Sequence, residues 1–309
     1  MVHLMLVNMM ERKYMMNTHT TLYQRHGNYI PRVAAIHDLC GYGKCSLGVA
    51  IPVLSAAGCD VCSVPTALFS SHTKYPVFAM HDTTNFLPEF LDAWQSCPVD
   101  LDAVYSGFLG SAEQVDIIKR VWNEYPHALR VVDPVMGDAG VMYPTYTPEL
   151  CEAMKSLVAD STILTPNLTE ASILTGIPYE GQQVSNSTID KILHELHTMG
   201  AQHVCLKGIL SAEKPCSITN IISSANGNRS SVESELLPYM LHGTGDLFAS
   251  CLTAAVMAGK TLLESVEFAS MFVIESMKIT GDQPEFEMRG VSFETQLWRA
   301  AELLHTTSL

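Results

Sequence analysis

The stretch "LPYMLHGTGDLFASCLTAAVMAG" (residues 237–259) places Gly243, Thr244, Gly245 and Asp246 directly before a long apolar run. The run predicts a buried helix that begins at Gly245. Because glycine carries no side chain, the backbone N–H groups at this helix N-terminus are left open, and such an end favours an anion. Asp246 could simply cap the helix, but capping does not require two preceding glycines. A carboxylate beside an anion pocket suits phosphoryl transfer to an alcohol, since it can remove the hydroxyl proton.

The rest of the chain supplies the scaffold for that helix. Short apolar runs, which predict buried strands, alternate with amphipathic helical stretches. This order predicts a three-layer α/β/α fold with a mostly parallel central sheet. A hairpin around Asn226-Gly227 (216–236) and two helices, beginning at Gly245 and near Leu262, follow it. The strands are predicted at 32–37, 60–65, 102–107, 129–134, 161–166 and 203–208, and the helices at 46–58, 111–125, 147–160 and 188–200.

Composition limits the possible functions. The chain has 309 residues, of which 47% are hydrophobic and 16% charged, so it is globular rather than disordered. Its formal net charge of -14 argues against a nucleic-acid partner, which would need a basic face. No apolar run approaches the roughly 20 residues of a membrane span, so no membrane partner is expected. Without internal repeats or a linker, residues 31–309 are expected to form one domain.

Two further features concern the N-terminus and the cysteines. Residues 1–30 are predicted to be a poorly ordered extension, with the fold beginning at Arg32. Charge follows their apolar part rather than preceding it, which is the wrong order for a secretory signal.

Nine cysteines without such a signal indicate a reducing compartment, the cytoplasm. Cys59 and Cys62 form a CxxC with no second pair, and we interpret them as small buried residues rather than as a redox or metal pair.

Polar side chains follow the predicted parallel strands at their carboxyl ends. Asp38 and Asp133 end two of them, Thr165 and Asn167 end a third, and Lys207 ends a fourth. Each alone could be a cap or turn residue. Because ligands of such sheets bind at the carboxyl ends of the strands, their shared position predicts one site at this edge.

Several motifs resemble those of the ribokinase-like kinases, and in particular the pyridoxal kinases within their vitamin-kinase branch. The resemblance runs from residue 32 to about 280 and implies a ribokinase-like fold. It implies transfer of the γ-phosphoryl group of ATP to a hydroxymethyl group, with Mg²⁺, often a monovalent cation such as K⁺, and a homodimer. The motifs are "AAIHDLCGYG" (34–43), "ALFSSHT" (67–73), "VYSGFLGS" (104–111), "DPVMGD" (133–138), "TPNLTEASILTG" (165–176) and "HGTGDLFAS" (242–250).

The resemblance implies a role for each matching residue on the nucleotide side. Asp246 is the base that deprotonates the 5′-hydroxymethyl group of the vitamin, and Gly243, Thr244 and Gly245 form the anion hole. Asp133 lies near the transferring phosphate and its cations. The remaining roles are Mg²⁺ binding, largely through water, by Asn167 and Glu170, phosphate contacts by Thr165 and Lys207, and a loop over ATP that carries Asp138 and Tyr143.

On the vitamin side, the residues that match the lining of the pyridine ring are Asp38, Ala67, Phe69, His72, Thr73 and Phe108. Two of them depart from the family, because pyridoxal kinases often have serine in place of Asp38 and tyrosine in place of Phe108. The loop "DAGVMY" (138–143) is also shorter than in animal members. An acid near the ring favours a protonated ring nitrogen or an amine, so we expect pyridoxamine or pyridoxine to be used alongside pyridoxal.

Three alternative functions can be compared with the residues. Hydroxymethylpyrimidine kinase is the nearest, although the "SSHT" motif favours a pyridoxal kinase. A non-catalytic vitamin or nucleotide sensor would have no need to keep Asp246, Asn167, Glu170 and both glycines together. A Rossmann dehydrogenase does not fit, because the glycines of "CGYGKCSLG" (40–48) after the first strand are wrongly spaced for that fold.

Overall fold

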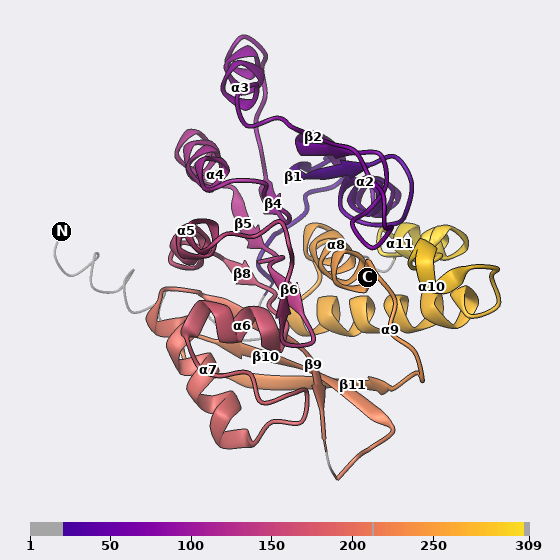
Figure 1. Cartoon of the computed structure of the whole chain (residues 1–309). Helices are drawn as coiled ribbons and strands as arrows, with labels where there is room; N and C mark the ends of the chain where they lie inside the picture. Colours follow the sequence, from indigo (N-terminus) through magenta and orange to yellow (C-terminus); the bar gives the residue numbers. More distant parts are fainter. Residues whose placement is uncertain (1–20, 212, 306–309) are drawn as a thin grey trace, which may run out of the picture.

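The computed structural model describes residues 21–211 and 213–305, and its centre is a nine-stranded sheet (Figure 1). The strand order is β11-β10-β9-β8-β5-β4-β1-β2-β3. The six strands from β9 to β2 run parallel, while β10, β11 and β3 pair antiparallel with their neighbours. The nine strands are β1 Arg32–Cys40, β2 Asp60–Phe69, β3 Met80–Asp82, β4 Ala103–Ser106, β5 Leu129–Val132, β8 Ile163–Leu164, β9 His203–Leu210, β10 Ser217–Ser224 and β11 Arg229–Glu235.

Helices cover both faces of this sheet, which confirms the predicted three-layer α/β/α architecture. Figure 1 shows α4, α5 and α6 on one side of the strands and α8, α9 and α11 on the other. The helices are α2 Leu47–Ala56, α3 Leu87–Gln95, α4 Ala112–Glu124, α5 Pro148–Val158, α6 Leu168–Thr175, α7 Asn186–Thr198, α8 Thr244–Met257, α9 Leu262–Thr280, α10 Phe286–Arg289 and α11 Leu297–Glu302, with a 3₁₀ turn at Glu294–Gln296.

The alternation of side chains along the strands produces two hydrophobic cores. Ala34 and Ile36 of β1 pack with α3 to α7, whereas Val33 and Ala35 pack with α2, α8, α9 and α11. Strands buried on both faces are therefore apolar throughout, which is why they read as short continuous apolar runs. The same alternation separates the CxxC pair, since Cys59 belongs to the second core and Cys62 packs against the first.

All six predicted parallel strands form, and the antiparallel hairpin turns at Asn226-Gly227 as expected. Three strands run further than predicted: β1 continues to Cys40, β2 to Phe69 and β9 to Leu210. Asp38 and Lys207 thus lie inside strands rather than at their ends, which corrects the prediction. The edge strand β3 and the helices α3 and α6 were missed. The strand β3 has three exposed residues and no apolar pattern.

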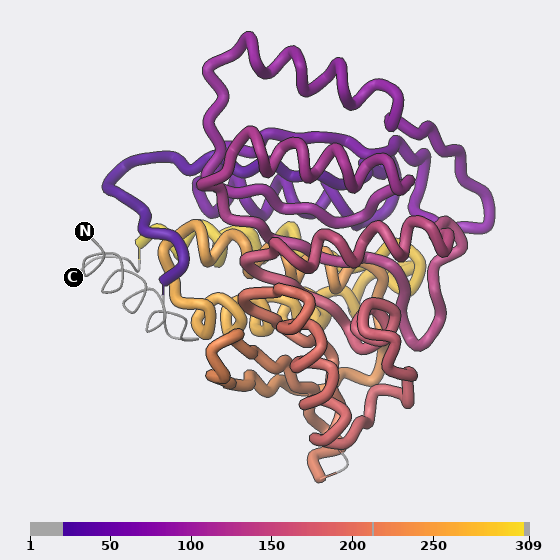
Figure 2. Tube along the Cα trace, turned by 90° about the vertical axis from the view of Figure 1, so that its left-hand side faces the viewer, coloured from indigo at the N-terminus to yellow at the C-terminus, as the bar shows by residue number. Residues whose placement is uncertain are grey.

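The predicted N-terminal extension falls mainly on residues 1–20, which lie outside the described residues. Residues 21–30 contact the domain, so the folded region begins before Arg32 (Figure 2). Thr21 pairs with Thr261. The Tyr23 hydroxyl donates to Asp102 Oδ1 at 3.0 Å, and Arg25 donates to the carbonyl groups of residues 57 and 58. In the described part of the chain, no helix is both long and apolar enough to span a membrane.

Candidate active site

One cavity of about 300 Å³ opens where the strands end, and it joins nearly all of the predicted site residues. Its lining comes from segments far apart in the sequence, including the end of β1, the start of α6, β9 and the N-terminus of α8. The predicted residues on its wall are Asp38, Phe69, His72, Thr73, Phe108, Asp133, Asp138, Tyr143, Asn167, Glu170, Lys207, Gly243, Thr244, Gly245 and Asp246.

Two predicted residues lie behind this wall. Thr165 is fully buried and donates its hydroxyl to Asp133 Oδ1 at 2.8 Å, so it supports a residue of the lining instead of facing the cavity. Ala67 is fully buried in the first hydrophobic core. Ala67 is therefore not part of the cavity wall, where its predicted contact with the pyridine ring would be made.

Helix α8 begins at the glycines for a steric reason. Gly243, its N-cap, has a φ of 83°, and a Cβ there would lie 2.1 Å from the Lys44 carbonyl oxygen. The first turn of α8 packs directly against the segment before α2. A residue with a side chain would therefore fit this position only if the chain moved. The residues of this N-terminus, Gly243 to Asp246, line the cavity.

Asp246, in the first turn of α8, has a pKa suited to a general base. Burial, with the nearby charges of Asp133 and Asp38 adding to its effect, raises this pKa from 3.8 to about 7. A hydrogen bond from the Ser46 backbone N–H and the charge of Lys207 oppose the shift. A carboxyl group with a pKa near neutrality can both accept and release a proton at physiological pH.

Ser46 connects Asp246 to the other acid of the cavity. Its hydroxyl donates to Asp38 Oδ1 at 2.5 Å, while its backbone N–H reaches Asp246. This serine has a φ of 51°, a conformation that costs a residue with a side chain about 1–3 kcal/mol. Nothing in the sequence pattern marked Ser46, because its importance lies in the backbone angle and in contacts across the sheet edge.

An ion pair lies in the cavity beside the N-terminus of α8. Lys207 Nζ donates to Asp133 Oδ1 at 2.8 Å, with Asp133 1% exposed and Lys207 9% exposed. Burial lowers the pKa of Lys207, but Asp133 and Glu170 outweigh it, so the pKa is raised and the amine stays charged. The same ammonium group lies close to Gly245 at the N-terminus of α8. Asp133 Oδ2 is buried and has no hydrogen-bond partner.

The motif "TPNLTE" folds into the start of α6 as a capping box. Glu170 N–H donates to Asn167 Oδ1 at 2.8 Å, and Asn167 N–H donates to Glu170 Oε2 at 2.7 Å. Burial raises the pKa of Glu170 to about 8; Lys207 opposes this shift and Asp133 adds to it. The pair therefore presents polar oxygens beside Asp133, at the end of the cavity where the ion pair lies.

The segment with Asp138 and Tyr143 forms a small hairpin that borders the same end. Its strands are β6 Gly137–Asp138 and β7 Val141–Met142, and its turn residues Ala139 and Gly140 both have positive φ. Gly140 N–H donates to Thr169 Oγ1 at 2.8 Å, which ties the hairpin to α6. Burial raises the pKa of the Tyr143 phenol, with Glu170 adding to the shift.

The opposite end of the cavity has an aromatic wall. Phe69 and Phe108 meet edge to face, with ring centroids 5.9 Å apart. His72 is 2% exposed and its Nε2 lies 2.8 Å from the Met288 carbonyl oxygen, so this nitrogen donates. Burial lowers the pKa of His72, which favours the neutral imidazole. Flat apolar surfaces with few polar groups fit a flat aromatic ligand.

Residues 50–290 match the family model described as phosphomethylpyrimidine kinase. The chain belongs to the phosphomethylpyrimidine kinase family. A pyridoxal kinase of Deinococcus radiodurans is 31% identical over 72% of this chain and 78% of its own length.

Two solved structures are similar to most of this chain. One, described as a putative phosphomethylpyrimidine kinase from Bacteroides thetaiotaomicron with pyridoxal, is 32% identical and has a TM-score of 0.83, covering 88% of this chain and 96% of the other. Pyridoxal kinase from Lactobacillus plantarum is 26% identical and has a TM-score of 0.82, covering 91% and 100%. The match supports the ribokinase-like fold class that the motifs implied.

Proposed function

We propose that this kinase transfers the γ-phosphoryl group of ATP to the 5′-hydroxymethyl group of a B6 vitamer: pyridoxal, pyridoxamine or pyridoxine. The observation that carries the proposal is the place of Asp246. It lies at the open N-terminus of α8, in a cavity with an aromatic wall at one end and the Lys207–Asp133 pair at the other. A flat hydroxymethyl-bearing ring and a polyphosphate can thus reach the carboxylate from opposite ends.

The residues define a single displacement step. Asp246 takes the proton of the hydroxymethyl group, and the resulting alkoxide oxygen forms a bond to the γ-phosphorus as the bond to the leaving β-phosphate oxygen breaks. The N–H groups at the start of α8 and the ammonium group of Lys207 stabilise the negative charge on the transferring group. ADP and the vitamer 5′-phosphate are the products.

Mg²⁺ is the metal that the family implies for the nucleotide, and the residues fit it. Asp133 Oδ2 is buried without a partner, and oxygen donors are the ligands Mg²⁺ prefers. Asp133 would hold the ion, with Asn167 and Glu170 acting largely through water, because their own oxygens are engaged in the capping box. When bound, the ion neutralises phosphate charge. A monovalent cation such as K⁺ and a homodimer are further expectations from the resemblance, and a cytoplasmic location is the expectation from the nine cysteines.

A panel of acceptors tests the proposed function. ADP release and product mass should be measured with Mg²⁺–ATP and pyridoxal, pyridoxine, pyridoxamine or hydroxymethylpyrimidine. We expect the three vitamers to have higher kcat/KM values than hydroxymethylpyrimidine. The second candidate, hydroxymethylpyrimidine kinase, is favoured by the description of the matching family model. A higher kcat/KM for the pyrimidine would support it, and binding without ADP release would indicate a sensor.

The raised pKa of Asp246 predicts the pH dependence of the reaction. A general base must be deprotonated, so kcat/KM for the vitamer should fall about tenfold per pH unit below the Asp246 pKa of about 7. The profile should be recorded at saturating Mg²⁺–ATP over about two pH units on each side of neutrality. If kcat/KM instead stays constant down to the ordinary range of an aspartate, Asp246 does not titrate as proposed.

Asp38 predicts a preference among vitamers. Its carboxylate is buried at the cavity wall, and a substrate amine there would gain a charge-assisted hydrogen bond. Such a bond contributes about 1.5–3 kcal/mol against 0.5–1.5 for a neutral one. Asp38→Ser should therefore reduce kcat/KM for pyridoxamine several-fold relative to pyridoxal, with KM for ATP little altered. An unchanged ratio, with equal losses for both vitamers, would restrict Asp38 to its contacts with Ser46 and Cys40.

A further inference from the structure

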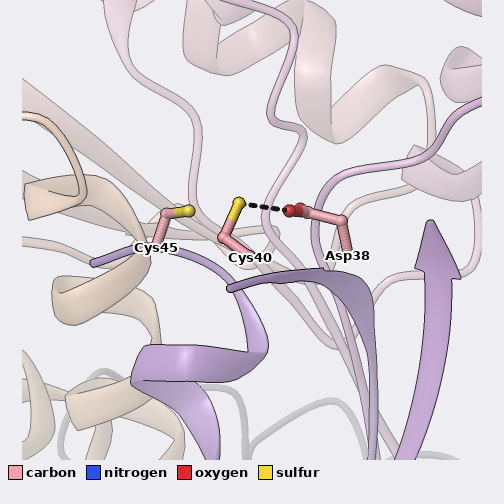
Figure 3. Close-up of side chains that lie close together, drawn as sticks. All are labelled: Asp38, Cys40 and Cys45. Carbon is pink, nitrogen blue, oxygen red and sulfur yellow. Dashed lines mark hydrogen bonds between the residues drawn. The ribbon is translucent and has the colours of Figure 1, made fainter. Parts of the chain in front are cut away.

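Two thiols and a carboxylate meet at the wall of the cavity, and the proposed reaction uses neither thiol. Asp38 and Cys40 are two residues apart in β1, and Cys45 comes from the loop that leads into α2. Figure 3 shows the two sulfur atoms and the carboxylate close together. Their ligand atoms all lie within 4.8 Å of one another, and Asp38, Cys40 and Cys45 are 4%, 9% and 5% exposed.

The backbone holds this cluster in place. The pairing of β1 with β2 shifts register between His37 and Leu39, so Asp38 lies at an irregularity of the strand, a feature that re-aims side chains. Ser46, with its positive φ, turns the chain immediately after Cys45 and donates to Asp38 Oδ1. Cys40 Sγ donates to Asp38 Oδ2 at 3.3 Å, which leaves both sulfur atoms beside the same carboxylate.

These donors fit a thiophilic divalent cation of the zinc type. Four-coordinate zinc binds sulfur at about 2.3 Å and carboxylate oxygen at about 2.0–2.2 Å, so tetrahedral ligand atoms are about 3.3–3.8 Å apart. Atoms already within 4.8 Å need to move inward by about 1 Å or less. Three protein ligands leave one position open, and all three residues line the cavity, where water can fill it.

We propose that Asp38, Cys40 and Cys45 form a binding site for a thiophilic divalent cation, and that the bound ion competes with the vitamer. The competition follows because Asp38, once it binds the ion, cannot also face the substrate. This site is separate from the Mg²⁺ ligands proposed above, which are oxygen donors at the nucleotide end. Only the competition rests on the proposed function; cation binding does not.

Binding is a proton exchange without oxidation. A buried cysteine that is not close to a cation ordinarily keeps its proton at neutral pH. Each thiol loses its proton to water as its sulfur binds the ion, so two protons leave for each divalent cation bound. The charge of the cluster is therefore the same before and after binding. The affinity should rise with pH, as is usual for thiolate sites.

Cd²⁺ is a suitable probe, because cadmium–thiolate bonds absorb in the ultraviolet. The full chain, freed of metal and kept reduced with a phosphine, should be titrated without nucleotide, so that metal–ATP complexes play no part. We expect one saturable site with a thiolate-to-metal band and release of two protons. Cys40→Ser and Cys45→Ser should each weaken binding at least about 100-fold, since even supporting residues of metal sites contribute 10–100-fold.

Matched controls come from two exposed cysteines, Cys97 and Cys216. Cys97→Ser and Cys216→Ser should leave the band, the affinity and the kinase activity unchanged. Loss of the band in either control, persistence of it in both cluster variants, or no saturable band in the unmodified protein would overturn the site.

A second measurement uses only the unmodified protein, so it does not depend on whether the variants fold. Saturating pyridoxine should weaken Cd²⁺ binding at least about tenfold, and Cd²⁺ should raise KM for the vitamer without lowering kcat. If pyridoxine binds and leaves the Cd²⁺ affinity unchanged, the competition is wrong even where the band depends on Cys40 and Cys45. If no vitamer is phosphorylated, the proposed function is wrong, while the cadmium band still decides the site.

Discussion

Asp246→Asn should lower kcat for vitamer phosphorylation by about 10²–10⁴-fold, the usual contribution of a general base. Asparagine has the size of aspartate and can still accept a hydrogen bond from the Ser46 N–H group, but it cannot take a proton at neutral pH. The open N–H groups of α8 and the Lys207–Asp133 pair are unchanged by this substitution. Binding of ATP should therefore change little, which can be measured by calorimetry beside steady-state kinetics.

Ser250→Ala is a matched control on the same helix. Ser250 is fully buried, and its hydroxyl lies 3.3 Å from that of Tyr105 behind the first turn of α8. This change should alter kcat far less than Asp246→Asn does. A near-normal kcat in Asp246→Asn would reduce Asp246 to a helix-capping residue, and the proposed reaction would lose its base.

Lys207→Met should lower the free energy of unfolding by about 3 kcal/mol, because it leaves the Asp133 carboxylate buried without its charged partner. This value is at the lower end of the range for broken buried ion pairs, since the cavity lets water reach the site. The substitution should also weaken ATP binding, because it removes the ammonium group beside the N-terminus of α8. Urea unfolding and ATP calorimetry measure the two effects separately.

A double substitution distinguishes the ion pair from packing. Asp133→Asn combined with Lys207→Met removes both charges, so it should recover part of the stability lost in Lys207→Met alone. If the double variant instead loses as much stability as Lys207→Met and Asp133→Asn lose together, the effect comes from packing of the lysine side chain and not from its charge.

The sheet could be predicted because its strands are buried on both faces and therefore read as apolar runs. The first strand shows the limit of this pattern. "RVAAIH" marks its start, but the irregularity after His37 and the continuation to Cys40 depend on pairing with β2. The segment before Arg32 carries no apolar pattern, and its attachment depends on single bonds such as Tyr23 to Asp102, 79 residues apart.

The candidate site, like the sheet, could be predicted only in part from the sequence. Gly243 and Asp246 could be found because a helix N-terminus with glycines has a local sequence signature. Asp133 and Lys207 were each predicted near the phosphates, but their direct ion pair spans 74 residues and has no local pattern. Ser46 and the Cys40–Cys45 contact depend on a strained turn, which only the backbone angles reveal.

The central claim is that Asp246 activates the vitamer hydroxymethyl group for attack on the γ-phosphate of ATP. The most direct measurement is a single turnover of pyridoxal with Mg²⁺–ATP, with ADP and phosphorylated product quantified together and the product identified by mass and phosphorus NMR. The account predicts equal amounts of ADP and pyridoxal 5′-phosphate, formed about 10²–10⁴ times more slowly by Asp246→Asn. ADP without the 5′-phosphate, or equal rates for both proteins, would contradict it.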